Sequence, residues 1–150
     1  MIPRAVVLFV LGFAARVSGQ TASPPIGAER IFVGSFGKSD QAAQIRQAVM
    51  GELRRHGKLK LVASPEAADG ILTGSGEVWI KGYYSLNPRA RSLNEDAHPI
   101  FGGYLSVELK GKGNAVLWSY LATPHRFGPD AISRNLAAQV VKKLRQALDH

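Results

Sequence analysis

The sequence contains no cysteine. This absence excludes disulfide bonds even in an oxidising compartment, and it excludes the acylated cysteine that anchors a lipoprotein. A chain of 150 residues is nevertheless long enough to bury a hydrophobic core without disulfide or metal staples. We therefore expect a single domain stabilised by ordinary packing.

Long hydrophobic runs are also scarce, and the one that exists lies at the N-terminus. It extends from Ala5 to Ala15, between Arg4 and Arg16, and small residues follow at positions 17–19. A membrane-spanning helix needs about 20 apolar residues, whereas a charged start, a short apolar run and small residues are typical of a secretory signal peptide.

We therefore predict that residues 1–19 are a cleaved signal peptide, which would leave no transmembrane segment and place the protein in the periplasm or outside the cell. Residues 20–29 (QTASPPIGAE) contain small, polar and proline residues, which is typical of a flexible N-terminal arm. Residues 30–150 would then form the single domain.

Acidic residues are few: 11 Asp and Glu stand against 19 Lys and Arg, for a net charge of +8. A basic protein attracts anionic partners over long range. In the envelope these are acidic proteins and anionic polymers. No DNA- or RNA-binding signature accompanies the basic residues, so we do not expect nucleic acid as the partner.

Two glycine-rich stretches resemble nucleotide-binding loops but fail the required spacing. Before Gly37-Lys38-Ser39, the position at which a phosphate-binding loop needs its first glycine holds Phe32. In Gly74-Ser75-Gly76, Trp79 stands where a dinucleotide-binding loop needs its third glycine. Because the spacing shapes the backbone around the phosphates, we expect no nucleotide and no other cofactor.

Candidate catalytic and metal-binding groups do not form a recognisable set. The four histidines, His56, His98, His125 and His150, lack partners at the spacing of a zinc site. Hydrolases with two carboxylates need an acid and its partner a few ångströms apart, and the sequence selects no pair from Glu77, Glu95, Asp96 and Glu108. A small hydrolase acting on cell-wall or polysaccharide material remains the alternative to a non-catalytic protein.

Hydrophobic periodicity predicts five strands and two helices. The strands are expected at 30–36, 58–63, 70–80, 104–109 and 115–122, with a bulge or close backbone approach at Gly74 and Gly76. The first helix is expected after Ser39, with Arg46 facing solvent, a C-terminal stop at Gly57 and an apolar face formed by Ala42, Ile45, Val49 and Leu53.

The second helix begins near Gly128-Pro129-Asp130, and its apolar face consists of Ile132, Leu136, Val140, Leu144 and Leu148. Trp79 and Trp118 are expected in the core or on a sheet face. The predicted fold is an α/β (α+β) layer of order β-α-β-β-loop-β-β-α, in which two amphipathic helices cover a mixed sheet.

The segment from Lys81 to Gly103 has no clear periodicity, and a connection of that length is often functional. Its first part combines aromatic, amide and basic side chains: Lys81, Tyr83, Tyr84, Asn87, Arg89 and Arg91. Tyrosine and arginine are the residue types that anchor interfaces. We predict these six residues as a partner-binding site, with a solvated loop as the alternative.

Several short stretches resemble a group of envelope α/β domains. They are the first strand ending in Gly34-Ser35-Phe36, the run Ala68-Asp69-Gly70-Ile71-Leu72-Thr73-Gly74, and the late hairpin ending Val116-Leu117-Trp118-Ser119 before the last helix. The group includes the curli-secretion protein CsgG, the lipoprotein activators of penicillin-binding proteins, and the amino-terminal domain of TolB. The resemblance covers roughly residues 30–148 and implies a non-catalytic binding or adaptor module of the cell envelope.

Overall fold

The computed structural model describes residues 27–86, 89 and 97–149. Its strands are β1 (Arg30–Val33), β2 (Lys60–Leu61), β3 (Gly70–Ser85), β4 (Ala97–Lys110) and β5 (Val116–Ala122), and its helices are α1 (Asp40–His56) and α2 (Pro129–Leu148). Two 3₁₀ turns, η1 (Pro65–Ala67) and η2 (Lys112–Asn114), complete it. This order confirms the predicted fold class. The predicted signal peptide, 1–19, lies outside the described residues.

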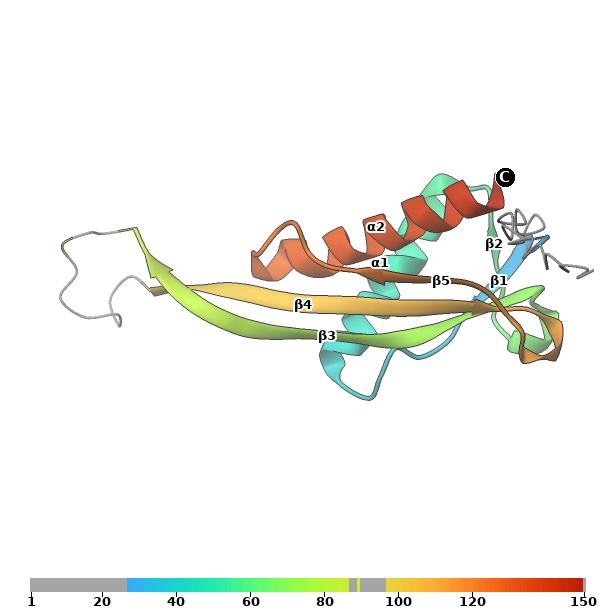
Figure 1. Cartoon of the computed structure of the whole chain (residues 1–150), viewed down its shortest axis with the longest axis horizontal. Helices are drawn as coiled ribbons and strands as arrows, with labels where there is room; N and C mark the ends of the chain where they lie inside the picture. Colours follow the sequence, from blue (N-terminus) through green and yellow to red (C-terminus); the bar gives the residue numbers. More distant parts are fainter. Residues whose placement is uncertain (1–26, 87–88, 90–96, 150) are drawn as a thin grey trace, which may run out of the picture.

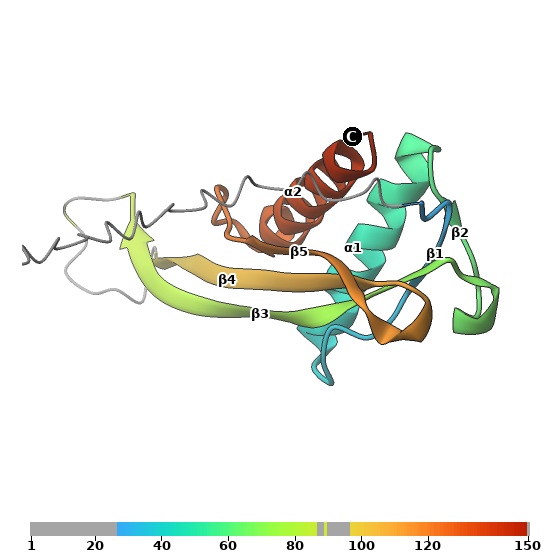
Figure 2. The same cartoon turned by 45° about the vertical axis from the view of Figure 1, so that its right-hand side comes forward.

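The strands form one mixed sheet in the order β2-β1-β3-β4-β5. β1 is parallel to both β2 and β3, whereas β4 is antiparallel to both β3 and β5. Figures 1 and 2 show the two helices beside each other against the sheet. The buried strand residues alternate with exposed ones, so the helices cover one face and leave the other open.

Helix α1 begins and ends where the sequence predicts. The Ser39 hydroxyl accepts a hydrogen bond from the Ala42 backbone N–H at 3.1 Å, and Gly57 ends the helix with φ of +65°. A left-handed residue at this position suits glycine because it has no Cβ. The predicted apolar face is confirmed, since all four of its members are buried: Ala42, Ile45, Val49 and Leu53.

Helix α2 supplies the other half of the helix layer. Its predicted apolar face is also confirmed: Ile132, Leu136, Val140 and Leu144 are buried and Leu148 packs against them. Two side chains of α2 hold the segment that enters it. The Gln139 amide donates to the Thr123 carbonyl at 2.7 Å, and the Asn135 side-chain oxygen accepts from the His125 backbone N–H at 2.8 Å.

Arg46 does not face solvent as the helix periodicity predicts. Its guanidinium donates to the carbonyl of Val33 at 2.8 and 3.0 Å and to that of Gly34 at 3.0 Å. Periodicity reports only the direction in which a side chain leaves the helix, and arginine is long enough to bend back to unpaired carbonyls. Arg46 therefore joins α1 to the end of β1.

The predicted loop from Lys81 to Gly103 is wrong over most of its length. β3 continues to Ser85 and β4 begins at Ala97, with Tyr84 paired opposite His98. No residue from Lys81 to Ser85 or from Ala97 to Phe101 is buried, so this part of the hairpin lacks the alternation of buried and exposed positions that makes a strand recognisable. The connecting segment is confined to residues 86–96.

Gly74 brings β3 and β4 closer than any other residue type would allow. A Cβ atom at Gly74 would collide with the backbone carbonyl of Ser106 and lie 2.9 Å from Cα of Val107. The predicted close approach is therefore confirmed. The register shift of the β3–β4 pair lies further along, between Ile80 and Gly82.

We expect Gly74→Ala to destabilise the protein, because the new methyl group meets backbone that can move only by separating the strands. Overpacking of this kind costs about 1 to 3 kcal/mol. Gly82→Ala is the matched control on the same strand, since a Cβ at Gly82 meets nothing within 4 Å; we expect it to change the free energy of unfolding by less than about 0.5 kcal/mol. Denaturant unfolding measures both, and equal effects would contradict the close approach.

Arg30 and Asp69 join the start of β1 to the residue before β3. The guanidinium donates to the two carboxylate oxygens at 2.8 and 3.2 Å, and the Arg30 backbone N–H donates at 3.0 Å. The Asp69 N–H donates back to the Arg30 carbonyl at 2.8 Å. The side-chain hydrogen bond from Arg30 lowers the pKa of the Asp69 carboxyl to about 2.

This shift predicts a specific acid dependence of stability. Because the pKa of Asp69 is lower in the folded chain than its ordinary value of about 3.9, its contribution is complete above that value and is lost as the pH falls towards 2. We expect Asp69→Asn to show a smaller loss of stability than the wild type between about pH 5 and pH 2. Thermal unfolding measured across that range tests this, and identical pH profiles would exclude the contribution.

Candidate functional site

The distal half of the β3–β4 hairpin extends past the helix layer. We call residues 77–86 and 97–103 the arm. Its inner end, at Val78 and Phe101, still packs against the core, whereas Figure 1 shows its outer end projecting to the left, beyond the start of α2. Length explains the projection. Helix α2, with 20 residues, is about 30 Å long, whereas β3, with 16 residues, spans about 53 Å. The helices therefore cannot cover the whole strand.

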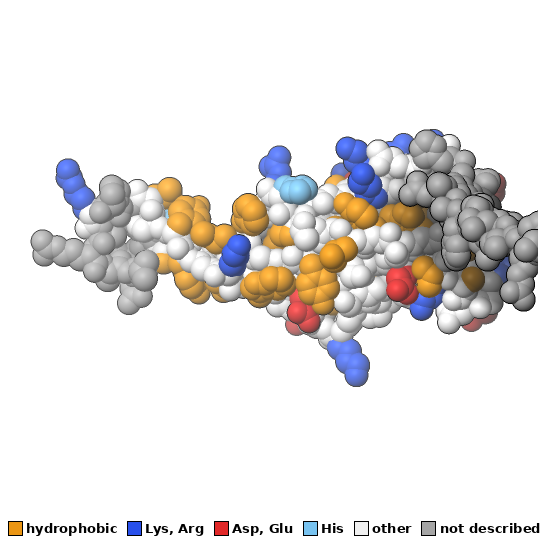
Figure 3. Space-filling view, in the orientation of Figure 1, with side chains coloured by type: hydrophobic (Ala, Val, Ile, Leu, Met, Phe, Trp, Pro, Cys, Tyr) orange, Lys and Arg blue, Asp and Glu red, His pale blue; other side chains and the backbone are white. Residues whose placement is uncertain are grey.

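Large apolar side chains are exposed along the arm. Their exposed fractions range from 46% to 73%, and Figure 3 shows apolar side chains over this end of the molecule. Several large apolar side chains exposed on one element mark an interaction site more often than a single exposed leucine does. The residues are Trp79, Ile80, Tyr83, Tyr84 and Leu86.

Trp79 lies flat against the neighbouring strand. A Cβ atom at Gly102 would lie 2.9 to 3.2 Å from three atoms of the indole, so the glycine leaves room for the ring. The Tyr104 ring lies next to it, with centroids 6.3 Å apart, and the Tyr104 hydroxyl is 3.2 Å from the Ser75 hydroxyl. Trp79 is on a sheet face, as predicted, and remains 46% exposed.

The two tyrosines of the predicted site point to opposite faces of the arm, because successive strand residues alternate. Tyr84 pairs with His98, and their rings are 5.4 Å apart. Tyr83 pairs with Pro99. The arm therefore presents an aromatic ring on each side.

The structure brings together part of the predicted partner-binding set. Lys81 lies at the register shift, two residues before Tyr83, and is exposed. Arg89 is exposed beyond the end of β3. Asn87 and Arg91 lie outside the described residues. Sequence reasoning did not connect Trp79, Tyr104 and Phe127 with this candidate site. Trp79 lay at the end of the predicted strand 70–80, and continuing that strand past Ile80 would have linked it to the two tyrosines.

A groove of about 290 Å³ lies between the outer half of the arm and the segment that enters α2. It is lined by Tyr84, His98, Pro99, Ile100, Phe127 and Gly128. Phe127 comes from the segment that enters α2, and its carbonyl accepts a hydrogen bond from the Phe101 N–H at 3.0 Å. Its side chain is 50% exposed. The groove is therefore continuous with the apolar surface of the arm.

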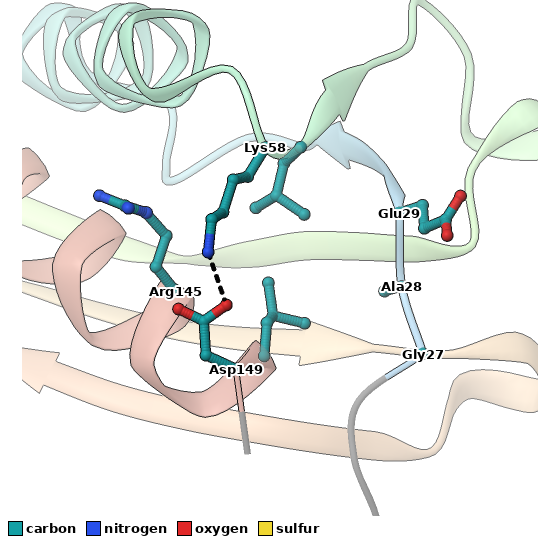
Figure 4. Close-up of a pocket in the computed structure, with 8 residues that line it drawn as sticks. Gly27, Ala28, Glu29, Lys58, Arg145 and Asp149 are labelled. Atoms are coloured by element: carbon teal, nitrogen blue, oxygen red, sulfur yellow. Dashed lines mark hydrogen bonds and ion pairs between the residues drawn. The ribbon is translucent and has the colours of Figure 1, made fainter.

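A second pocket, of about 380 Å³, lies between the start of β1 and the end of α2. Figure 4 shows Lys58 and Asp149 meeting across it, with 2.9 Å between Nζ and Oδ1. Arg145 lines the pocket and places Nη1 3.1 Å from Nδ1 of His56. Lys58 and Asp149 are thus paired with each other, and the residues that line the pocket include no hydroxyl or thiol side chain that could act as a nucleophile.

The acidic residues considered for a hydrolase are not paired. Glu77 lies opposite Tyr104 on β4, and Glu108 is four residues further along that strand. This separation corresponds to about 13 Å along the strand, beyond the 5 to 9.5 Å or so that paired catalytic carboxylates require. Glu108 also lies 3.6 Å from Lys110. Glu95 and Asp96 lie outside the described residues.

Within residues 27–86, 89 and 97–149, no group of three or more His, Asp and Glu side chains is placed to hold a metal ion. In the same residues, no helix is both long enough and apolar enough to cross a membrane.

Comparison with known proteins identifies a shared fold. No protein-family model and no curated protein matches the chain. Two solved structures of the PelC dodecamer from Paraburkholderia phytofirmans match, one of them a leucine-to-methionine variant. The variant has 20% sequence identity and a TM-score of 0.52, and the match covers 83% of this chain and 92% of PelC. The other has 17% identity and a TM-score of 0.51, covering 81% and 90%.

An uncharacterised lipoprotein B from Nitrosomonas europaea is also similar, with 16% identity and a TM-score of 0.46, over 89% of this chain and 88% of the lipoprotein. At identities this low, the two PelC matches indicate a shared fold and leave function open. None of these neighbours is CsgG, a penicillin-binding-protein activator or TolB, so the resemblance to those families stays a prediction.

Proposed function

We propose that the protein is an exported, non-catalytic binding module of the cell envelope, and that the arm is the surface that recognises its partner. The observation that carries this proposal is the arm itself. Strand pairing holds Tyr83 and Tyr84 in place on the projecting part, at exposed fractions of 57% and 46%, and Trp79 nearer the helices at 46%. Exposed apolar area costs solubility, so its retention on a projecting element favours a role in binding.

The charge of the chain indicates the chemistry of the partner. The net charge is +8. Lys81 lies within the arm, two residues from Tyr83, and Arg89 lies beyond the end of β3. Aromatic rings supply desolvated contact area, while lysine and arginine attract and hydrogen-bond carboxylate or phosphate groups. The proposed partner is therefore an envelope protein or an anionic polymer that displays acidic groups.

The export part of the proposal rests on the N-terminal apolar run and its small-residue boundary. The similarity to lipoprotein B from Nitrosomonas europaea, with a TM-score of 0.46, is too low to support export. A hydrolase is the weaker reading, because Glu77 and Glu108 lie too far apart to act together.

The arm predicts that binding and stability can be separated. We expect the double variant Tyr83→Ala/Tyr84→Ala to weaken binding to the partner captured from an envelope extract by at least about tenfold, or about 1.4 kcal/mol. Its free energy of unfolding should change by less than about 1 kcal/mol, since both side chains are exposed. Lys81→Ala/Arg89→Ala should weaken binding mainly at low salt, where charge interactions are least screened.

Val116→Ala is the matched control, because Val116 is 54% exposed but lies away from the arm, and we expect it to bind like the wild type. Immobilised partner and an interferometric or plasmon-resonance titration give the affinities. Wild-type affinity in both arm variants would move the binding site elsewhere.

A further inference from the structure

β5 forms one edge of the sheet. In the order β2-β1-β3-β4-β5 it pairs with β4 on one side only, and in Figure 2 it is outermost in the row of β3, β4 and β5. Within the described part of the chain, no hydrogen bond is made to the outer side of the β5 backbone. Such an edge exposes a row of N–H and C=O groups that a further strand can pair with.

The other edges of this sheet carry features that discourage pairing, and β5 has few of them. β2 is only two residues long and contains Lys60. On the arm, Lys81 lies at the register shift of β3, and Pro99 removes a donor from β4. β5 (VLWSYLA) contains neither a charged residue nor a proline, so nothing in its composition opposes association with another strand.

The sequence of β5 is symmetric in character about Ser119. One residue away on either side are Trp118 and Tyr120, and two residues away are Leu117 and Leu121. In an antiparallel pair of identical strands centred on Ser119, each aromatic residue therefore faces an aromatic residue and each leucine faces a leucine. Cross-strand pairs of matched apolar or aromatic side chains are those that stabilise sheets.

The two faces of β5 support this match. Trp118 and Tyr120 lie on the face covered by the helices, opposite the buried Leu109 and Val107, and their rings stack with centroids 6.0 Å apart. Leu117 and Leu121 remain 41% and 58% exposed. A second strand beside β5 would cover the aromatic pair on one face and the two leucines on the other.

A register shift in the β4–β5 pair limits the usable length. It leaves Leu117 without a direct partner on β4, while Trp118 to Ala122 pair regularly. A bulge increases the local twist of a strand, so the regular part of the edge begins at Trp118. It includes the three central residues, Trp118, Ser119 and Tyr120, while Leu117 stands at its irregular end.

We infer that β5 pairs antiparallel with β5 of a second copy of this chain, with Ser119 on the two-fold axis. The sheet then continues through both copies, and each arm projects free of the contact. The interface is isologous, because each copy contributes the same strand. This inference does not depend on the partner-binding role of the arm.

The absence of cysteine makes a direct test possible. In an antiparallel pair, opposed Cα atoms lie about 4.5 to 5.5 Å apart, which is within the range that a disulfide can bridge. We expect Ser119→Cys to form a covalent dimer under mild oxidation, seen on a non-reducing gel. The control Leu86→Cys, at the 73% exposed tip of the arm, should remain mainly monomeric.

A second experiment, with charged residues at position 119, distinguishes a specific dimer from cross-linking by random collision. Ser119→Lys places two like charges at the axis and should raise the dimer dissociation constant by at least roughly tenfold in sedimentation, as should Ser119→Asp. An equimolar mixture of the two variants should recover dimer, because opposite charges then meet. Ser119 is exposed, so both variants should unfold at denaturant concentrations close to that of the wild type.

Cross-linking at position 119 together with recovery in the mixture supports the inference. A wild-type protein that sediments as a monomer at all concentrations overturns it, as does a dimer unaffected by Ser119→Lys. Equal or faster cross-linking of Leu86→Cys would also overturn it, because the arm would then be the contact between copies.

Discussion

The pairing of β3 with β4 is the interaction on which the rest of the structure depends. It joins the parallel part of the sheet, β2-β1-β3, to the antiparallel part, β3-β4-β5, and it supplies the buried residues against which both helices pack. The close approach at Gly74 fixes how near the strands lie. Beyond the helices the same pairing continues and holds the arm, so one ladder of hydrogen bonds determines both the core and the exposed surface.

The two helices and the core strands were predictable from sequence because each buries one face. Ile45 and Val49 in α1, and Leu136 and Val140 in α2, recur at helical spacing and are buried. The alternation of Leu105, Val107 and Leu109 likewise identified β4 near the core. In each case a buried face leaves a periodic trace in the sequence.

The outer part of the arm was not predictable in the same way, because strands with no buried residue on either face leave no such trace. Residues such as Tyr83, Pro99 and Gly103 look like parts of a loop when read one by one, and only the partner strand shows that they are paired. The site residues Lys81, Tyr83 and Tyr84 were nevertheless selected from their chemistry. The role of Arg46 was missed because it depends on carbonyls of β1 that periodicity cannot locate.

The proposed functions lie in different parts of the molecule. The helix layer stabilises the proximal sheet, the arm is the proposed surface for a partner, and the β5 edge is the proposed contact with another copy. A two-fold contact through β5 would leave the arms uncovered, so each dimer could present two of them. Two linked sites can bind a multivalent polymer more tightly than either alone.

The most direct test of the account is amide hydrogen exchange measured on the free protein and on its complex with the captured envelope partner. The account predicts that residues 77–86 and 97–103 exchange more slowly in the complex, while the core amides of α1 and α2 are unchanged. Slower exchange in other segments, with the arm exchanging at its free rate, would contradict the assignment of the arm as the binding surface.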